Sequence, residues 1–427
     1  MTILILGNGG REHALAWKIS QSHHCNQLFI ASGNAGTQKF GTNIALGIND
    51  FEAIKTFCID NNIDVLVVGP EEPLVKGIYD FMEAAKDVWK GFVVGPSAAA
   101  AQLEGSKAFS KKFMQRHNIP TAAYAEFTKD NFEEGKQYIA NHALPIVLKA
   151  DGLAAGKGVV ISETHADALV AYENMIINQQ FGDASSRVVI EEFLEGIEVS
   201  VFALTNGIDY QIIGHAKDYK RIGEGDTGLN TGGMGCVSPV PFMDDLFMQI
   251  VDTTIIQPTV KGLQTEGLVY HGFIFFGLMN CNGIPKLIEY NCRLGDPETE
   301  VVLPRLDTDL LSLFAAMDNG TLEDTNINFK DDYFATVMAV SGGYPGDYET
   351  NMQIDGLKNM QIEKTSMVFH AATKQMGDKI VTNGGRVLTI TSSADSIKEA
   401  VEKSKAVLAT INFEGMTYRK DIGYEFE

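Results

Sequence analysis

Short apolar runs alternate with amphipathic stretches along the first hundred residues. The spacing of apolar positions between these runs predicts helices such as His13–Ile19 and Phe51–Asn61. Buried strands separated by helices predict an α/β domain with a doubly wound parallel sheet. The predicted strands, each closely followed by Gly, Pro or Ser, are Ile3–Leu6, Leu28–Ile30, Val65–Val68 and Phe92–Val94.

From about residue 108 the pattern becomes that of an α+β fold. A long glycine-rich loop is predicted over 223–239, followed by a helix over 246–264. The tail again shows strand-like runs beside glycine-rich turns. The strands predicted in these parts are Ile146–Ala150, Gly158–Ser162, Val188–Phe193, Val199–Leu204, Tyr210–Ala216, Gly272–Cys281, Pro285–Asn291, Ala335–Ser341 and Arg386–Ser392.

The length of the chain calls for more than one hydrophobic core, because single domains usually run to about 100–200 residues. A helix-prone bridge lies at 97–107 and a polar stretch at 320–332. We therefore predict an N-terminal domain over 1–103, a central domain over 109–318 and a small α+β C-terminal domain over 328–427.

The charge balance limits the kinds of partner. The chain has 34 Lys+Arg against 55 Asp+Glu, a formal charge of −21, which repels nucleic acids and anionic lipids. The five cysteines form no C-x-x-C pair, and no apolar run approaches the ~18 residues of a membrane span. The N-terminus reads as a strand rather than a signal peptide. We expect a cytoplasmic protein, a monomer, with no nucleic-acid or membrane partner.

The turn GNGGREH, residues 7–13, joins the first strand to the first helix. Glycines there let the backbone approach an anion at the helix N-terminus. The dinucleotide fingerprint needs glycine at its sixth position, where this chain has Glu12. A phosphate site is therefore predicted and NAD binding is disfavoured, while a purely structural turn remains an equal alternative.

The segment KADGLAAGKGV, Lys149 to Val159, is a second glycine-rich loop. It is not a Walker A loop, because only three residues separate Gly152 from Gly156, and Gly158 follows Lys157. A flexible loop carrying Lys157, after a strand that ends in Lys149, could cover a triphosphate and exclude water. The alternative is a hairpin with a solvated lysine.

Two acidic strands follow. In VVIEEFLEGIE, the backbone could pair with adenine and Glu198 could accept from ribose hydroxyls, although alone it is a strand with acidic flanks. In IEYNCRLGDPETE, Glu289 and Asn291 lie two apart and so share one face of a strand. A carboxylate with an amide oxygen suits Mg²⁺. Arg293 has the same parity and offers a fork for a carboxylate or phosphate.

The order of these motifs resembles the ATP-grasp superfamily. Lys107 in LEGSKAFSKKFM is similar to its first phosphate lysine and Lys149 to its second, and AAGKG to its phosphate-covering loop. The resemblance implies a mobile ATP subdomain at about 122–194. Many members place another metal carboxylate about twelve residues before the first, and Gly277 occupies that position here. The resemblance also makes EEFL the adenine hinge, that is Glu191, Glu192, Phe193 and Leu194.

Within the superfamily the chain resembles the phosphoribosylamine–glycine ligase family. The similar stretches run in order from residue 7 to residue 423 and include GNGGREHALAWK, VGPEEPLVKG, DTGLNTGGMG, NCRLGDPETE, TNGGRVL and RKDIG. The resemblance implies ligation of glycine to 5-phosphoribosylamine through glycyl phosphate. The products would be glycinamide ribonucleotide, ADP and phosphate, in de novo purine biosynthesis.

The resemblance also implies roles for individual residues. ATP would meet Lys107, Lys149 and Lys157, with Mg²⁺ or Mn²⁺ on Glu289 and Asn291. Lys149, Lys157 and Arg293 would be catalytic, Arg293 holding the glycine carboxylate. The groups expected to hold phosphoribosylamine are Asn8, Gly9, Gly10, Arg11, Glu12 and Asp218.

Two other activities stay open at this point. One is another ATP-grasp carboxylate–amine ligase or a biotin-dependent carboxylase subunit, which EEFL and IEYN would fit equally well. The other is an NAD-dependent dehydrogenase built on the N-terminal sheet.

Overall fold

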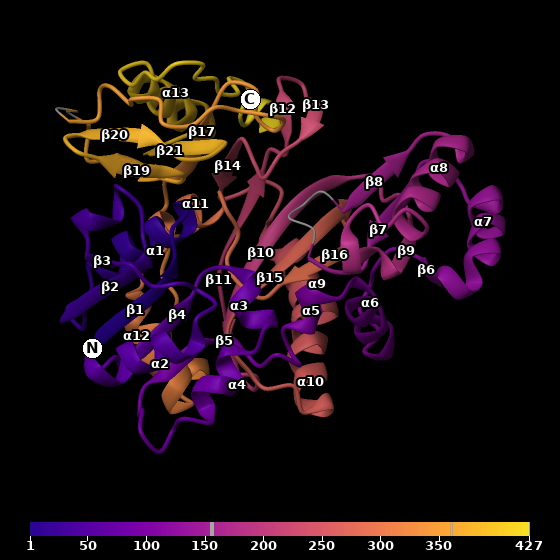
Figure 1. Ribbon diagram of the computed structural model, residues 1–427, viewed down its shortest axis with the longest axis horizontal. Coiled ribbons are helices and arrows are strands. Elements are labelled where there is room, and N and C mark those ends of the chain that lie inside the picture. Colours follow the sequence, from indigo (N-terminus) through magenta and orange to yellow (C-terminus); the bar gives the residue numbers. More distant parts are fainter. Residues whose placement is uncertain (154–157, 359, 361, 427) are drawn as a thin grey trace.

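The computed structural model describes residues 1–153, 158–358, 360 and 362–426. The N-terminal and C-terminal parts of the chain lie against each other (Figure 1). A lobe stands apart from both and contains the strands β6 (Tyr124–Thr128), β7 (Ile146–Ala150), β8 (Val159–Ser162) and β9 (Arg187–Glu192). Between these parts run the strands β10 (Ile197–Thr205), β11 (Tyr210–Asp218), β15 (Tyr270–Cys281) and β16 (Ile284–Asn291). The mixed α/β architecture predicted from the sequence is confirmed. None of the helices in the described ranges is both long enough and apolar enough to cross a membrane.

The N-terminal domain contains the predicted doubly wound parallel sheet, in the order β5-β4-β1-β2-β3. Alternate residues of β1 face opposite cores: Leu4 packs into one cluster and Ile5 into the other. The elements are β1 (Thr2–Gly7), α1 (Gly10–Ile19), β2 (Gln27–Ser32), η1 (Thr37–Lys39), β3 (Thr42–Ile44), α2 (Phe51–Asp60), β4 (Val65–Val68), α3 (Glu71–Val75), α4 (Ile78–Glu83), β5 (Phe92–Pro96) and α5 (Gln102–Gly105).

The strand order places a switch point between β1 and β4. From β1 the chain continues to β2 and β3 on one side, and then returns to β4 and β5 on the other. In open α/β sheets, ligands bind at the carboxyl ends of the strands beside such a point. The turns that follow β1 and β4 are therefore the expected ligand-binding edge of this domain.

The central part is antiparallel. A four-stranded sheet, β6-β9-β7-β8, forms the separate lobe with α7 and α8, and β15 joins the remaining strands to β5. The elements are α6 (Lys107–Arg116), β6 (Tyr124–Thr128), η2 (Lys129–Asn131), α7 (Phe132–Asn141), β7 (Ile146–Ala150), β8 (Val159–Ser162), α8 (His165–Ile176), η3 (Gly182–Ser186), β9 (Arg187–Glu192), β10 (Ile197–Thr205), β11 (Tyr210–Asp218), α9 (Asp245–Val251), α10 (Gln257–Glu266), β15 (Tyr270–Cys281), β16 (Ile284–Asn291), α11 (Thr299–Arg305) and α12 (Leu310–Asn319).

The C-terminal part extends the same sheet through β14 (Gly235–Ser238) and is covered by α13 (Ile397–Leu408) (Figure 1). Val337, Ile390 and Val401 belong to its own core cluster. The elements are η5 (Leu322–Asp324), β17 (Tyr333–Val340), β18 (Ser366–His370), β19 (Thr373–Met376), β20 (Lys379–Thr382), β21 (Arg386–Ala394), α13 (Ile397–Leu408) and η6 (Tyr424–Phe426).

One local prediction is wrong. The stretch 223–239 is not one long loop: it continues a hairpin of β12 (Arg221–Gly223) and β13 (Thr227–Asn230) and then forms β14 (Gly235–Ser238). Positive φ at Gly225 lets the hairpin turn, and β14 is buried between β11 and β17. The helix predicted over 246–264 is confirmed: α9, a π-helical turn at Asp252–Ile256 and α10 follow one another without a break.

Candidate active site

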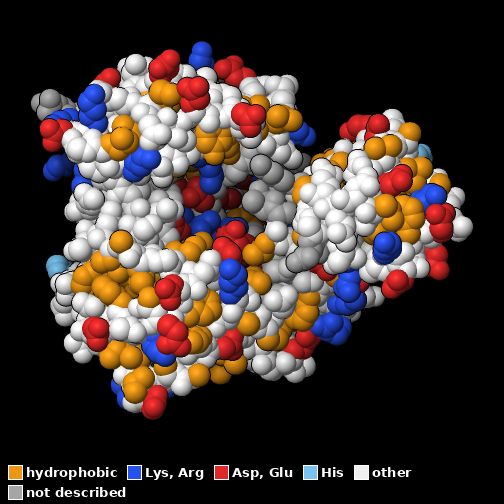
Figure 2. Space-filling model, in the orientation of Figure 1, with side chains coloured by type: hydrophobic (Ala, Val, Ile, Leu, Met, Phe, Trp, Pro, Cys, Tyr) orange, Lys and Arg blue, Asp and Glu red, His pale blue; other side chains and the backbone are white. Residues whose placement is uncertain are grey.

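Acidic and basic side chains gather in a hollow between the three parts of the molecule (Figure 2). Two cavities lie in this region, one of about 180 Å³ and one of about 770 Å³. The smaller is lined by the predicted phosphate and metal residues, and the larger by Asn8, Gly9 and residues of the C-terminal part. The structure thus separates the predicted site residues into two neighbouring groups.

Lysines form one wall of the smaller cavity. Lys149, at the end of β7, places Nζ 3.0 Å from Glu191 Oε2, and Lys111 Nζ lies 3.1 Å from the same oxygen. Lys107, at the start of α6, donates to the carbonyl oxygen of Gly152 at 3.1 Å. The other oxygen of Glu191 is buried without a hydrogen-bond partner among the described residues. Lys157 lies outside the described residues.

The cavity keeps Lys149 charged. Burial alone would lower the pKa of Lys149, but the carboxylates of Glu191 and Glu289 outweigh burial and raise it. Burial lowers the pKa of Lys107, and it lowers that of Lys111 to about 8 despite the attraction of Glu191. The wall facing the cavity therefore keeps at least the positive charge of Lys149, which suits a polyphosphate.

Glu289 and Asn291 both line this cavity from β16, as their shared strand face predicts. Burial would raise the pKa of Glu289, but Lys149, Lys220 and Lys107 hold it below its usual value, so the carboxylate is ionised at neutral pH. A carboxylate and an amide oxygen on one face fit Mg²⁺, which takes few protein ligands and keeps waters and phosphate oxygens.

The strand opposite supplies no further ligand. Gly277 pairs directly with Glu289, and a Cβ at Gly277 would lie 3.3 Å from Glu289 Cγ. Within the described parts of the chain, no cluster of three or more His, Cys, Asp or Glu side chains could hold a metal. Two protein ligands, Glu289 and Asn291, are therefore what this strand pair offers.

Arg293 connects the smaller cavity to the N-terminal domain. Its Nη2 lies 2.9 Å from Glu104 Oε1, and its Nε lies 3.6 Å from Glu71 Oε2. Arg293 Nε is buried with no hydrogen-bond partner among the described residues. Burial would lower the pKa of Arg293, but the two carboxylates raise it, so its charge is permanent. The guanidinium is thus held in place with one donor still available.

The predicted adenine hinge follows β9. Glu192 accepts from the backbone N–H of Ala123 at 3.1 Å and lies 3.0 Å from Lys286. Phe193 is exposed and Leu194 partly buried, beyond the end of the strand. Glu198, on β10, forms an ion pair with Lys220. Of the five residues predicted for adenine and ribose, Glu191 lines the smaller cavity, whereas Glu192, Phe193, Leu194 and Glu198 do not. Glu198 acts on the cavity through its charge, which raises the pKa of Lys149 against the effect of burial.

The N-terminal turn holds carboxylates at the start of α1. The backbone N–H of Gly9 donates to Glu12 Oε2 at 2.6 Å, and that of Arg11 donates to Asp296 Oδ2 at 3.2 Å. A Cβ at Gly7 would lie 2.5 Å from Glu12 Cδ. Glu12 therefore fills the space that the third fingerprint glycine leaves open in a dinucleotide site.

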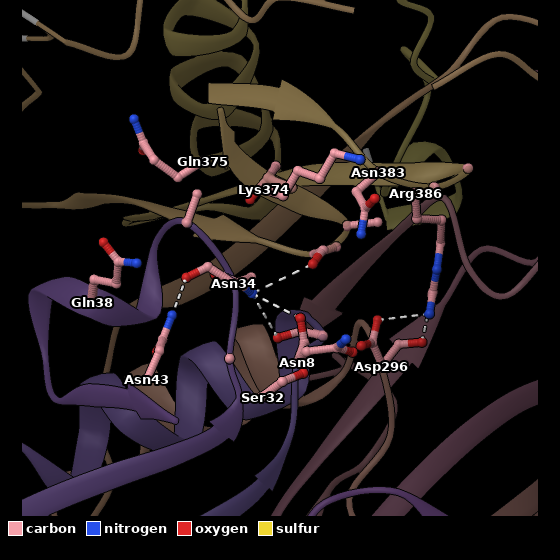
Figure 3. Close-up of a pocket in the computed structure, with 18 of the residues that line it drawn as sticks. Asn8, Ser32, Asn34, Gln38, Asn43, Asp296, Lys374, Gln375, Asn383 and Arg386 are labelled. Atoms are coloured by element: carbon pink, nitrogen blue, oxygen red, sulfur yellow. Dashed lines mark hydrogen bonds and ion pairs between the residues drawn. The ribbon is translucent and has the colours of Figure 1, made fainter. Parts of the chain in front are cut away.

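The larger cavity lies between the N-terminal and C-terminal parts (Figure 3). Asn34 joins these parts: its Nδ2 donates to the carbonyl oxygens of Asn8 at 2.9 Å and His370 at 2.8 Å. Opposite Asn8, Arg386 lies 2.8 Å from Asp296 Oδ1. The other polar side chains around the cavity are Ser32, Gln38, Asn43, Lys374, Gln375 and Asn383.

Not all residues predicted for phosphoribosylamine reach this cavity. Asn8 and Gly9 line it, whereas Gly10 and Glu12 are buried. Arg11 donates through Nη1 to the carbonyl oxygen of Gly69 at 2.8 Å, across the switch point. Asp218 is buried 3.3 Å from Lys220 Nζ, on the side of the ATP-grasp strands.

Sequence reasoning missed several residues of the site. Lys111 follows Lys107 by four residues, so helical spacing could have placed both on one face of α6. Lys220, which contacts both Glu198 and Asp218, belongs to no motif that the sequence singled out. Glu71 and Glu104 stand in stretches that carried the family resemblance, but only the fold brings them to Arg293.

Comparison with known proteins gives a family for each part of the chain. Residues 1–104, 105–299 and 334–425 match the N domain, the ATP-grasp (A) domain and the C domain of phosphoribosylglycinamide synthetase. The chain belongs to the phosphoribosylglycinamide synthetase family. Its similarity to phosphoribosylamine–glycine ligase of Vibrio cholerae serotype O1 is 45% identity over 428 residues, covering 99% of this chain and 98% of that protein.

Other relatives agree. Phosphoribosylamine–glycine ligase of Chlorobaculum tepidum is 45% identical over 429 residues, covering 99% of each chain. The crystal structure of phosphoribosylamine–glycine ligase from Thermotoga maritima is similar with a TM-score of 0.85 and 32% identity, covering 99% of this chain and 100% of that one. The biotin carboxylase domain of 2-oxoglutarate carboxylase from Hydrogenobacter thermophilus, at 18% identity and a TM-score of 0.70, shares the fold.

Family membership confirms the main sequence predictions. The chain is an ATP-dependent carbon–nitrogen ligase with the activity of its family, ligation of glycine to 5-phosphoribosylamine in purine biosynthesis, and uses ATP with Mg²⁺ or Mn²⁺. A biotin carboxylase shares only the fold with this chain, at 18% identity. None of the three family matches supports an NAD-dependent dehydrogenase.

Proposed function

We propose that glycine is activated in the smaller cavity and that 5-phosphoribosylamine occupies the larger one. One observation carries this assignment: Arg293 lines the smaller cavity and Asp296, three residues later on the same segment, lines the larger. The two cavities also flank the switch point between β1 and β4, where Arg11 meets Gly69. Two substrates bound there would have their reacting ends close together.

Activation is needed because a carboxylate is a poor electrophile. Transfer of the γ-phosphoryl group of ATP to glycine gives glycyl phosphate, and the ribosylamine nitrogen then attacks its carbonyl carbon and releases phosphate. Lys107, Lys149 and Lys157 offset the charge on the phosphates, and Arg293 holds the glycine carboxylate. These groups position substrates and stabilise charge, which is most of what phosphoryl transfer requires of a protein.

We assign the metal to Glu289 and Asn291. These two side chains would hold a Mg²⁺ ion, which would supply positive charge to offset that of the nucleotide phosphates. The adenine and ribose are assigned to the Glu191–Leu194 hinge and to Glu198. The subdomain at 122–194 is proposed to close over the nucleotide, because both the acyl phosphate and the ribosylamine are lost to water in an open site.

Within the larger cavity, we propose a different position for the phosphate of phosphoribosylamine from the one predicted at the N-terminal turn. Because Glu12 and Asp296 accept from the first backbone N–H groups of α1, a phosphate there would meet two carboxylates. We therefore place the phosphate beside Lys374 of the C-terminal part, and the ribose between Asn8 and the amides of Asn34 and Asn383. The amine would then point toward Asp296 and the smaller cavity.

The further proposals are that the protein acts as a monomer in the cytoplasm, on small molecules and without nucleic acid. The charge of −21 supports the last of these, because binding a polyanion needs basic surface. Size-exclusion chromatography with light scattering tests the oligomeric state.

The activity is tested by coupled measurement of ADP release with ATP and Mg²⁺. We expect release with glycine and 5-phosphoribosylamine together, and formation of glycinamide ribonucleotide in equal amount. NAD should give no thermal shift, whereas a ligand at a hundred times its dissociation constant adds about 2.7 kcal/mol of stability. ADP release that is independent of glycine, or a saturable shift with NAD, would contradict the proposal.

A further inference from the structure

Carboxylates as well as lysines line the smaller cavity. Glu71 and Glu104 both line it, on either side of Arg293. Glu104 is engaged at both oxygens: Oε1 lies 2.9 Å from Arg293 Nη2, and Oε2 accepts from the backbone N–H of Cys292 at 2.7 Å. Glu71 Oε2 lies 3.6 Å from Arg293 Nε, beyond hydrogen-bonding distance, and its side chain is 32% exposed. Glu71 is therefore the carboxylate that can accept another cation.

The fold directs Glu71 to this place. It is the first residue of α3, just after the carboxyl end of β4, and so stands at the switch point of the N-terminal sheet. Burial would raise the pKa of Glu71, but Arg293 and Arg11 hold it below its usual value. The side chain is thus a carboxylate at neutral pH. Its carboxylate therefore brings a negative charge to this end of the cavity, beside the guanidinium groups of Arg293 and Arg11.

The chemistry of the substrate requires such a charge. Glycine is a zwitterion near neutral pH, and its carboxylate must face the γ-phosphate and the cations for activation. Its ammonium group then enters a closed site, where an unpaired charge is costly. We propose that Glu71 binds the ammonium group of glycine and thereby makes the site select an amino acid over a simple carboxylic acid. This assignment rests on the proposed function of the smaller cavity.

Glu71→Gln tests the assignment, because it removes the charge and keeps the shape. We expect the KM for glycine to rise roughly tenfold or more, with the KM values for ATP and phosphoribosylamine within about twofold of wild type. The matched control is Glu72→Gln, the next residue on α3, whose carboxylate pairs with Lys76 at 2.7 Å on the surface. The control should leave all three KM values unchanged.

A second measurement tests selectivity directly. Hydroxylamine traps acyl phosphates as hydroxamates, so its use with ATP and glycolate or acetate in place of glycine reports activation of acids without an ammonium group. We expect the preference for glycine over glycolate to shrink by roughly tenfold in Glu71→Gln and to persist in Glu72→Gln.

The outcomes separate this assignment from the function on which it rests. An active wild type with an unchanged glycine KM in Glu71→Gln overturns the role of Glu71 alone. A parallel rise of all three KM values in that variant also overturns it, since Glu71 would then only support Arg293. A wild type that releases no ADP with glycine and phosphoribosylamine refutes the proposed function itself.

Discussion

The two cavities hold polar groups of different kinds. Of the described side chains that line the smaller cavity, four are basic and four are acidic, and they contact one another directly, as Lys111, Lys149 and Glu191 do. The larger cavity has three charged side chains, Asp296, Lys374 and Arg386, and is otherwise lined largely by amides, hydroxyls and backbone. Fixed charges held by ion pairs suit phosphoryl transfer, whereas neutral donors and acceptors suit recognition of a sugar.

The difference also concerns how each cavity is built. The smaller cavity takes its lysines from α6 and β7 and its acids from α3, α5, β9 and β16, which are all helices and strands. The larger cavity is formed by turns of the N-terminal part and by strand ends of the C-terminal part, joined by Asn34. Substitutions in the first should therefore affect turnover and the binding of nucleotide or glycine, and those in the second mainly the affinity for phosphoribosylamine.

The largest effect is expected from Glu289→Gln. The change is nearly isosteric but removes the charge of the proposed metal ligand, so turnover at ordinary Mg²⁺ should fall roughly 100-fold or more while thermal unfolding stays the same. Measurement of kcat as a function of Mg²⁺ concentration checks this. Glu133→Gln, at an exposed position on α7, is the control. Full activity of Glu289→Gln would refute the assignment of the metal to β16.

Lys149→Met should weaken ADP binding about tenfold, because it deletes a charged contact with the phosphates. Calorimetric titration with ADP and Mg²⁺ gives the dissociation constant. The control, Lys112→Met, changes a half-exposed lysine of α6 that pairs with Glu126 at 2.9 Å. An unchanged ADP affinity in Lys149→Met would mean that Lys149 only forms an ion pair with Glu191 and does not bind the phosphates.

Lys374→Ala tests the role of the larger cavity, which Lys374 lines. It should raise the KM for phosphoribosylamine roughly fivefold and leave ADP affinity and the KM for glycine at wild-type values. Lys379→Ala, on the exposed start of β20, is the matched control. If the KM for ATP rose as well, the larger cavity would not be specific to the sugar substrate.

The sequence allowed the smaller cavity to be predicted better than the larger one. Glu289 and Asn291 follow from strand parity, since alternate residues of β16 share a face, whereas Arg293 lies two residues beyond the end of that strand. The contacts of Arg293 with Glu71 and Glu104 could not be predicted, because they join residues about 190 to 220 positions apart. The same holds for the larger cavity, which forms only when Lys374 and Arg386 meet Asn8 and Asn34.

Glycine-rich segments were the least predictable. The turn at Asn8–Glu12 has the residues of an anion site, but the acceptors at its helix start are Glu12 itself and Asp296, which only the tertiary structure supplies. The stretch 223–239 has many glycines that could belong to a loop. Burial of β14 between β11 and β17 decides in favour of a strand.

The smallest effect is expected from pH. Lys111 has a pKa of about 8 because burial opposes its charge, although Glu191 attracts it. As the pH rises through 8, Lys111 loses its proton in the folded protein and one positive charge leaves the phosphate wall. ADP affinity should then fall by roughly twofold to threefold between pH 7 and 9, since the lysine acts near the phosphates and Lys149 keeps its charge.

The effect of Lys111 on protein stability has the opposite sign to its effect on ADP affinity. Between pH of about 8 and the ordinary value of 10.5, the unfolded chain binds more protons at Lys111 than the folded protein, so this group makes the free energy of unfolding increase with pH. The groups facing Lys111 are Lys149, Glu191, Glu289, the Thr121 hydroxyl and the Tyr124 ring. Lys111→Met should remove both pH dependences, and an unaltered loss of ADP affinity above pH 8 in that variant would assign it to another group.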